Sequence, residues 1–281
     1  YFKRGVTYAG GQITCGQSGS VIANHTDGAV TVSGVFTSAS GGFIAAGVNA
    51  GTDWLYVYHN KESVTGTWVE STGLYAIASV DSATQITLAS SPARAWATAE
   101  LPYFIIRPIT YKAAVGWGTG EATLTGGGVM SVLINSGDKG QIRVDGLAFT
   151  NTLSSGYYYR GALTFTSAGS PHFHIANCTF TNCGDSGAYM GGDYVVATNN
   201  TATNCAAFGV RTVGISSLFE HNTVTGGTRS GADGMRFTVI RYSTLTDIVG
   251  SYGGFHGDSI GEINGGATGN VDYGWIYGNK I

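Results

Sequence analysis

The sequence has little charge and almost no proline. Only 11% of its 281 residues are charged and only 4 are proline, so the Glu- and Lys-rich helices of a bundle or coiled coil are excluded. The formal net charge of −3 provides no broad basic field for phosphates or anionic lipids. No apolar run approaches the length of about 20 residues that a membrane-spanning helix needs. We therefore expect neither nucleic acid nor membrane insertion.

Cysteine is also scarce, and the first residues have no targeting signal. Cys15, Cys178, Cys183 and Cys205 show no spacing typical of zinc sites, so buried thiols are expected. Cys183 and Cys205 are 22 residues apart, which leaves a disulfide between them open. Residues 1–5 contain neither an initiator Met nor an apolar signal core. The sequence therefore predicts a fragment or a processed piece.

What the sequence does contain is a repeat. Short segments of the C-terminal half superpose without gaps at spacings of 31, 22, 22, 21 and 36 residues, which indicates a solenoid with loop insertions. Each segment carries two apolar positions five residues apart, and both must face one core. The first column is Phe149, Phe180, Ala202, Val224, Leu245 and Ile281, and the second is Val144, Ile175, Ala197, Phe219, Ile240 and Ile276.

An offset of five is odd, so an unbroken strand would point the two columns to opposite faces. A bend must lie between them. Asn200, Asn222, Asn279 and Ser243 stand two residues before the first column, and Asn tolerates the left-handed conformation that such a bend needs. We expect these residues to form the bend and to stack as a ladder. A second polar row, two residues after the column, consists of Asn151, Asn182, Asn204 and Asp247, with Gly226 as its exception.

These ladders, aliphatic stacks and turns resemble the right-handed parallel β-helix of the pectin-lyase-like superfamily. The resemblance covers residues 140–281 and extends more weakly to residues 2–13. It implies an all-β fold, a right-handed single-stranded parallel β-helix. In that superfamily an amphipathic cap usually precedes the first coil, and none is visible here. We therefore expect ends that are truncated or covered by another subunit.

Residues 36–110 depart from the coil period. They contain alternating segments such as 51–58, 73–80 and 101–107 between turn residues, which predict a small antiparallel β insertion. The sequence of this region resembles that of short β modules in phage tail and virion proteins. The expected domains are a first coil region at 1–35, the insertion at 36–110 and the main β-helix at 111–281.

Charged residues recur in the second strand of the coils. Aligning the small-then-apolar pairs stacks Asp233 on Asp258 and Arg211 on Arg236. These stacks are either solvated ion-pair ladders, each pair worth under about 1 kcal/mol, or a site. In a site, the arginines would bind a sugar carboxylate while the aspartates hold a hydroxyl or a cation. No cofactor is expected, and a bound Ca²⁺ ion is left open.

Catalysis is a second hypothesis for the same residues and His256. The resemblance implies paired Asp-Asp and Gly-His-Gly motifs for a hydrolase, and neither is present. His256 precedes Gly257 and Asp258, in a turn that is either structural or catalytic. A lyase needs a base and a group that neutralises the uronate carboxylate. Arg211, Arg236, His256 and Tyr189 could supply these roles. A lyase is thus favoured over a hydrolase, and enzyme status stays open.

Aromatic and basic residues near this strand are candidate substrate contacts. Tyr157 and Tyr158 lie in the loop of the 31-residue coil, where exposed rings either stack on sugars or pack on the helix. Arg160 and Tyr189 lie in the two columns that flank the small-then-apolar pairs of this predicted strand. These four residues are predicted to bind substrate.

Two histidines lie close together in the repeat. His172 and His174 flank Phe173 at the start of a coil, and this alternation would place both on one face. Because no third ligand stands at a readable spacing, no metal site is expected.

The leading functional hypothesis is an extracellular or virion-associated β-helix of tail-spike or fibre type. It would present a polysaccharide-binding surface, with or without depolymerase activity, as a homo-oligomer, either a trimer or an end-to-end stack. One alternative is a secreted microbial polysaccharide lyase that acts as a monomer. Another is a structural protein whose coils stack into a filament.

Overall fold

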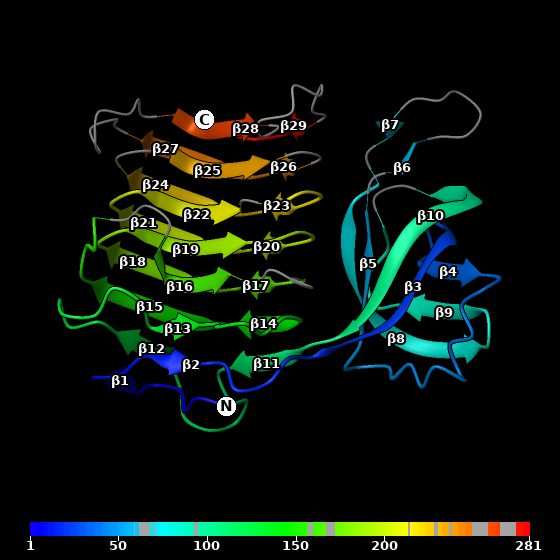
Figure 1. The fold of residues 1–281 in the computed structure, drawn as a ribbon, viewed down its shortest axis with the longest axis horizontal. Helices are drawn as coiled ribbons and strands as arrows, with labels where there is room; N and C mark the ends of the chain where they lie inside the picture. The colour runs from blue at the N-terminus through cyan, green and yellow to red at the C-terminus, as the bar shows by residue number, and fades with distance from the viewer. Residues whose placement is uncertain are drawn as a thin grey trace. The chain divides into compact units, whose positions relative to one another are not determined.

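The computed structural model describes most of the chain in two compact units. Described are residues 1–58, 60–61, 68–69, 71–92, 95–156, 160–166, 172–212, 214–227, 230–235, 238–248, 258–264 and 274–281, with the backbone alone at 60–61, 68–69, 97–98, 230–235 and 258–264. The first unit joins Tyr1–Ser18 to Thr110–Ile281, and the second is Gly19–Ile109. Both consist of β-strands (Figure 1).

The first unit is built of three seven-stranded parallel sheets, each of which takes one strand from successive coils (Figure 1). The predicted all-β parallel β-helix is therefore confirmed. Sheet 1 runs β1 (Thr7–Ala9), β12 (Ala122–Thr125), β15 (Leu147–Thr152), β18 (Thr179–Cys183), β21 (Thr201–Cys205), β24 (Thr223–Gly227) and β27 (Thr244–Ile248). Sheet 2 runs β11 (Ile109–Lys112), β14 (Ile142–Asp145), β17 (His174–Ala176), β20 (Val196–Thr198), β23 (Leu218–Glu220), β26 (Val239–Arg241) and β29 (Trp275–Tyr277). Sheet 3 runs β2 (Ile13–Thr14), β13 (Ile134–Asn135), β16 (Gly161–Thr166), β19 (Ser186–Gly191), β22 (Phe208–Thr212), β25 (Ser230–Met235) and β28 (Asp258–Asn264).

Both predicted apolar columns line the core of this unit. In sheet 1 each column member pairs with the next from Phe149 to Leu245, and in sheet 2 the pairing runs from Val144 onward. The rings of Phe149 and Phe180 stack at 5.1 Å. The last member of each column differs from the prediction, because Ile276 and Ile281 are 49% and 72% exposed. Among the described strands, none packs beyond them.

Three corners give each coil its shape, and each corner is a column of left-handed residues. The expectation that Asn200, Asn222 and their equivalents form the bend is wrong by one residue. The residue before each of them has the positive φ, because the bend must turn the backbone before the next side chain can enter the core. This first corner, between sheets 2 and 1, consists of Gly146, Asn177, Asn199, His221, Tyr242 and Gly278, with φ between 51° and 65°.

The predicted asparagine ladder does form inside the first corner. Asn200 and Asn222 are each 1% exposed. The Oδ1 atom of Asn200 accepts a bond from the N–H of Cys178 at 2.9 Å, and Oδ1 of Asn222 accepts from the N–H of Asn200 at 2.9 Å. Asn222 Nδ2 donates to the carbonyl of Ala197 at 2.9 Å. The side chains thus satisfy buried backbone groups that the bend takes out of the sheet.

The second predicted polar row is itself a corner, between sheets 1 and 3. Asn151, Asn182, Asn204 and Asp247 all have φ between 52° and 56°, and Gly226, the exception in the sequence, has φ 68°. What the row shares is therefore backbone conformation rather than polarity. A third corner leads into sheet 2. It consists of Gln141, His172, Tyr194 and Ser216.

The second unit is a closed six-stranded antiparallel barrel, in the order β10-β3-β4-β9-β8-β5. The prediction of a small antiparallel β insertion is thus confirmed. Its strands are β3 (Ser20–Val30), β4 (Val35–Ser38), β5 (Trp54–Val57), β8 (Gly73–Ser82), β9 (Gln85–Leu88) and β10 (Trp96–Arg107), with a separate pair β6 (Asn60–Lys61) and β7 (Trp68–Val69).

The start of the insertion differs from the expected residue 36. Strand β3 pairs with β10 and β4, so the barrel includes the segment that was assigned to a first coil. Phe36, Phe43, Leu55 and Tyr103 fill the barrel interior and are fully or almost fully buried. The sequence of β3 alternates weakly, which is why its partner could not be inferred locally.

Candidate functional site

The outer face of sheet 3 carries two of the predicted site residues, Tyr189 and Arg211. Leu163, Ala188 and Val210 pair in register and lie in the core. Their neighbours Thr164, Tyr189 and Arg211 also pair in register, so they point outward. Arg211 then pairs with Asp233 on the next coil. We call Thr164, Tyr189 and Arg211 the sheet 3 outer column.

Arg211 lies against two aromatic rings. Its guanidinium carbon is 4.6 Å from the ring centroid of Phe208 and 5.9 Å from that of Tyr189. Phe208 is buried, Tyr189 is 9% exposed and Arg211 is partly buried. The rings attract the cation and hold it in place, and partial removal from water strengthens its interaction with an anion. Two predicted site residues, Tyr189 and Arg211, are thus brought together.

The predicted stacking of like charges is wrong. The structure aligns Asp233 with Arg211 and Asp258 with Ser230, so the two aspartates lie at different positions along their strands. Gly231-Ala232 and Gly234-Met235 both fit the pattern of a small residue followed by an apolar one, and the structure aligns the first of these pairs with Gly209-Val210. The plain 22-residue period from Arg211 to Asp233 was the signal that would have found this register.

The other predicted residues divide into described and undescribed positions. Arg160 is exposed immediately before β16, and its carbonyl accepts a bond from the N–H of Ser186 at 3.1 Å. The side chains of Asp233 and Asp258 are not described. Outside the described residues lie Arg236, His256, Tyr157 and Tyr158.

Sequence reasoning missed Asp185, a buried carboxylate immediately before β19 of sheet 3. It is 1% exposed. Its Oδ2 atom accepts bonds from the N–H and hydroxyl of Ser155 at 2.9 and 2.6 Å, and Oδ1 accepts from the hydroxyl of Ser154 at 3.1 Å. Asp185 therefore fixes the segment that precedes the predicted tyrosines. A lone Asp between Gly184 and Ser186 offered no pattern to detect it.

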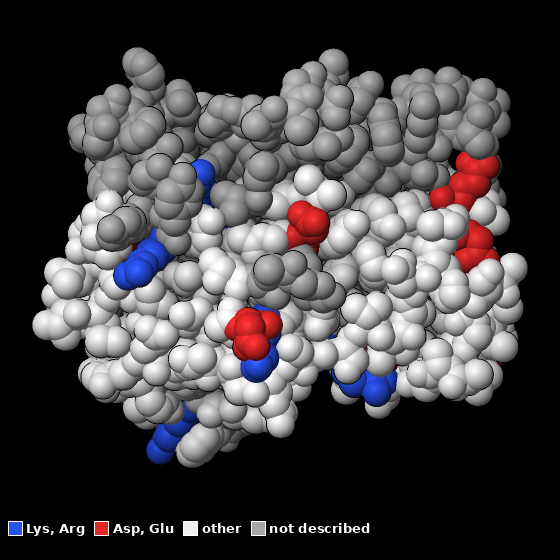
Figure 2. Space-filling model, viewed as in Figure 1, with Lys and Arg blue, Asp and Glu red and all other residues white. Residues whose placement is uncertain are grey.

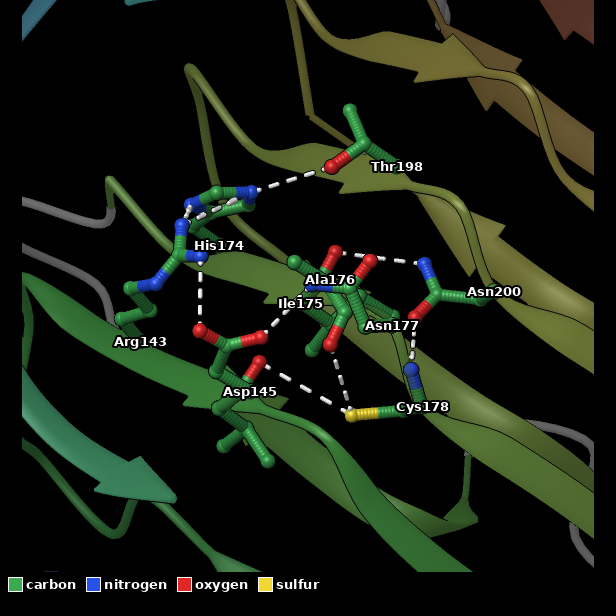
Figure 3. Close-up of polar contacts among 10 residues, drawn as sticks. Arg143, Asp145, His174, Ile175, Ala176, Asn177, Cys178, Thr198 and Asn200 are labelled. Atoms are coloured by element: carbon green, nitrogen blue, oxygen red, sulfur yellow. Dashed lines mark hydrogen bonds and ion pairs between the residues drawn. The ribbon is translucent and has the colours of Figure 1, made fainter. Parts of the chain in front are cut away.

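A polar cluster on sheet 2 was also missed, apart from His174 (Figure 3). Arg143 donates to Asp145 at 3.0 Å and contacts the ring of His174. Nε2 of His174 lies 3.2 Å from the Thr198 hydroxyl, and Asn177 donates to Asp145 at 2.8 Å. These residues come from three consecutive coils. Because Arg143 and His174 are only 7% and 5% exposed, the cluster holds coils together rather than presenting a surface.

The two histidines occupy different environments. His172 stands at the third corner and stacks on Tyr194 at 5.1 Å, while His174 belongs to the sheet 2 cluster. Burial lowers the pKa of His172 to about 4. Burial, and then the charge of Arg143, lower the pKa of His174 well below its usual value. In the part of the chain that the structure describes, no three His, Cys, Asp or Glu side chains lie close enough together to bind a metal ion.

We expect stability to fall as the pH is lowered from 7 towards 4. Both histidines bind protons less readily when folded, so the unfolded chain takes up more protons between pH 6.5 and 4, and stability rises with pH in that window. His172 alone accounts for about 3 kcal/mol over this range. Urea unfolding at several pH values measures the slope, which His172→Gln should reduce. An unchanged slope in that variant would contradict this account.

The four cysteines form no disulfide, and the described segments include no membrane-spanning helix. All four cysteines are free and buried, so the disulfide left open between Cys183 and Cys205 is not formed. Burial raises the pKa of Cys178 to about 12. None of the described segments forms a helix long and apolar enough to cross a membrane.

The surface around these sites is mostly uncharged. On the face shown in Figure 2, the described Lys, Arg, Asp and Glu side chains form small, separate groups.

Comparison with known families identifies the class of protein. The family described as "Right handed beta helix region" matches residues 129–280, which is more than half of the chain. The chain belongs to this right-handed β-helix family. No curated protein matches the sequence.

The solved structures similar to this chain include phage tailspikes. The tailspike gp49 of Pseudomonas phage LKA1 is 13% identical over 83% of this chain and 43% of that chain, with a TM-score of 0.38. Tailspike gp61 of Pseudomonas phage phi297 is 12% identical over 86% and 47%, with a TM-score of 0.34. The Gp54 tailspike of Acinetobacter baumannii bacteriophage AP22, solved with A. baumannii capsular saccharide, is 11% identical over 98% and 58%, with a TM-score of 0.35. The chain spans about half the length of these tailspikes.

Proposed function

We propose that the chain is the β-helical part of an extracellular or virion-associated protein of tail-spike or fibre type, and that the outer face of sheet 3 binds polysaccharide. The supporting observation is the position of Arg211 against Phe208 and Tyr189. A partly buried cation beside aromatic rings suits a sugar ring that bears a carboxylate. Coils spaced about 4.8 Å apart repeat such contacts along an extended glycan.

The remaining predicted residues extend this proposal along the same face. Asp233 pairs with Arg211 one coil further on, and in this proposal its carboxylate binds a neighbouring hydroxyl of the same sugar. Arg160 stands at the start of β16, one strand beyond β19 in the same sheet. We include Asp258, Arg236, His256, Tyr157 and Tyr158 in the proposed surface on their sequence positions.

A second candidate function is polysaccharide lyase activity, which the closeness of Tyr189 and Arg211 favours. Arg211 would neutralise the uronate carboxylate, and Tyr189 would remove the proton from the adjacent carbon. The bond from the next carbon to the glycosidic oxygen then breaks, and that oxygen takes up a proton while a double bond forms. Incubation with uronate-containing capsular polysaccharides, followed by ultraviolet absorbance of the unsaturated product, tests this activity.

A homo-oligomer is part of the leading proposal and separates it from the alternatives. Light scattering of the purified protein should show a trimer for a spike. A monomer would favour the secreted lyase, and a filament would favour a purely structural protein.

We expect Arg211→Ala to weaken the binding of an acidic glycan by about 1–3 kcal/mol, the range for one charge-assisted hydrogen bond. The melting temperature should change little, because Arg211 is outside the core. Titration calorimetry with hexagalacturonate and with purified acidic capsular polysaccharides measures this loss. Lys139→Ala, which removes a partly buried cation paired with Asp138 at 2.6 Å, is the matched control. Lost stability with unchanged affinity would assign Arg211 a structural role.

A further inference from the structure

The first corner departs from its own residue preference at two neighbouring coils. Four of its six positions hold Gly or Asn, but His221 and Tyr242 have φ values of 54° and 51°. Bulky residues in this region are uncommon and strained, and such strain persists where it serves another purpose. Because Asn or Gly forms the same bend in the other coils, the two rings are not needed for the bend itself.

The rings form a connected and exposed group. His221 and Tyr242 stack with centroids 5.3 Å apart and an interplanar angle of 18°, and Tyr277 meets Tyr242 edge to face at 5.5 Å. A Cβ at Gly278 would lie 2.6 Å from Cδ1 of Tyr242, so only glycine leaves this ring its space. Tyr242 and Tyr277 are 44% and 37% exposed, and the side chain of His221 is 53% exposed. We call His221, Tyr242 and Tyr277 the aromatic corner.

An ordered ion pair borders the aromatic corner. Nε of Arg241 donates to Oε1 of Glu220 at 2.7 Å, and Nη1 donates to the hydroxyl of Tyr277 at 3.1 Å. Nε2 of His221 is 3.8 Å from the same Glu220 oxygen. The side chains of Arg241 and Glu220 are only 8% and 19% exposed. Packing therefore holds these polar groups at the edge of an exposed aromatic surface.

The exposed aromatic rings and the polar groups at their edge are complementary to a ligand ring that is itself amphipathic. A pyranose has a C–H face, which packs on aromatic rings, and a rim of hydroxyls, which bond to fixed polar groups. We propose that the aromatic corner binds a sugar ring of the same polysaccharide, at a second site separate from Arg211. The corner joins sheets 2 and 1, whereas Arg211 is in sheet 3. This inference rests on the proposed function, because it needs a glycan ligand.

Two substitutions test the corner without disturbing its bend. Tyr242→Asn and His221→Asn each restore the residue type that Asn177 and Asn199 have in the same column. We expect each variant to bind the glycan at least about tenfold more weakly, the loss for one aromatic contact. The melting temperature should stay equal or rise, because Asn relieves strain. Asn199→Gly, one coil away in the same conformation, is the control and should bind as the wild type does.

The probes are a panel of purified bacterial capsular polysaccharides, measured by titration calorimetry beside melting curves. Weaker binding of Tyr242→Asn at unchanged stability would support the proposal. Wild-type affinity of that variant for a polysaccharide that the protein does bind would overturn the corner alone. A lower melting temperature with unchanged affinity would do the same and assign the stack to stability. If the wild-type protein binds no member of the panel, the corner and the proposed function both fail.

Discussion

Val224→Asp is expected to destabilise the β-helix by about 4 kcal/mol or more. Val224 is 1% exposed and pairs with Ala202 and Leu245 in the apolar column of sheet 1. A carboxylate at this position would be buried without a partner, which is among the largest penalties of a single substitution. Urea unfolding, together with the soluble fraction after expression, measures the effect.

The neighbouring position provides a matched control. Thr223 precedes Val224 in the same strand and is exposed, so Thr223→Asp should change stability by only about 0.5 kcal/mol. If Val224→Asp is too insoluble to measure, Val224→Ala should still cost about 2 kcal/mol through the cavity it leaves. Melting of Val224→Asp at the wild-type temperature would contradict the register of sheet 1.

Arg107→Met is expected to destabilise the barrel by about 3–5 kcal/mol. Arg107 donates from Nε and Nη2 to the two carboxylate oxygens of Asp53, both at 2.7 Å. The Asp53 side chain is fully buried. Without Arg107, its charge would keep only the bonds from the N–H of Asn49 and the hydroxyl of Thr52. Fluorescence-monitored urea unfolding, which reports on the buried Trp96, measures the loss.

Replacing the other partner of this ion pair should destabilise the barrel less. Asp53→Asn keeps the shape of the side chain, and the charge that remains is on Arg107, which is 42% exposed and can be solvated. We therefore expect Asp53→Asn to cost about 1–2 kcal/mol, as for a weakened hydrogen-bonded pair. Equal losses in the two variants would show that the buried charge on Asp53 is not the dominant cost.

The β-helix could be predicted from sequence because each coil repeats the environment of the last. Phe180, Ala202 and Val224 follow one another at 22 residues, so a gapless alignment was also the correct register. The exact site of the bend was not readable. Asn199 and Asn200 are adjacent and suit both the left-handed position and the buried ladder, so propensity could not choose between them.

The conformation of the aromatic corner was even less predictable from residue propensity. Propensity argues against aromatic residues at positive φ, and yet His221 and Tyr242 occupy it. Only the flanking ladder residues Asn222 and Ser243, which must point inward, determine which neighbour bends. Local preference was outweighed by the hydrogen-bonding needs of the buried backbone.

The sequence by itself determined the class of fold, the two core columns, the ladder and the presence of an inserted β unit, because all of these depend on short periods of apolar and small residues. Tertiary structure alone decided which charged and aromatic side chains meet. Arg143 meets His174 31 residues away, Arg241 meets Tyr277 36 residues away, and Arg107 meets Asp53 between two adjacent strands of the barrel unit. Loop lengths vary between coils, so the distance between such residues along the chain does not reveal which of them lie side by side.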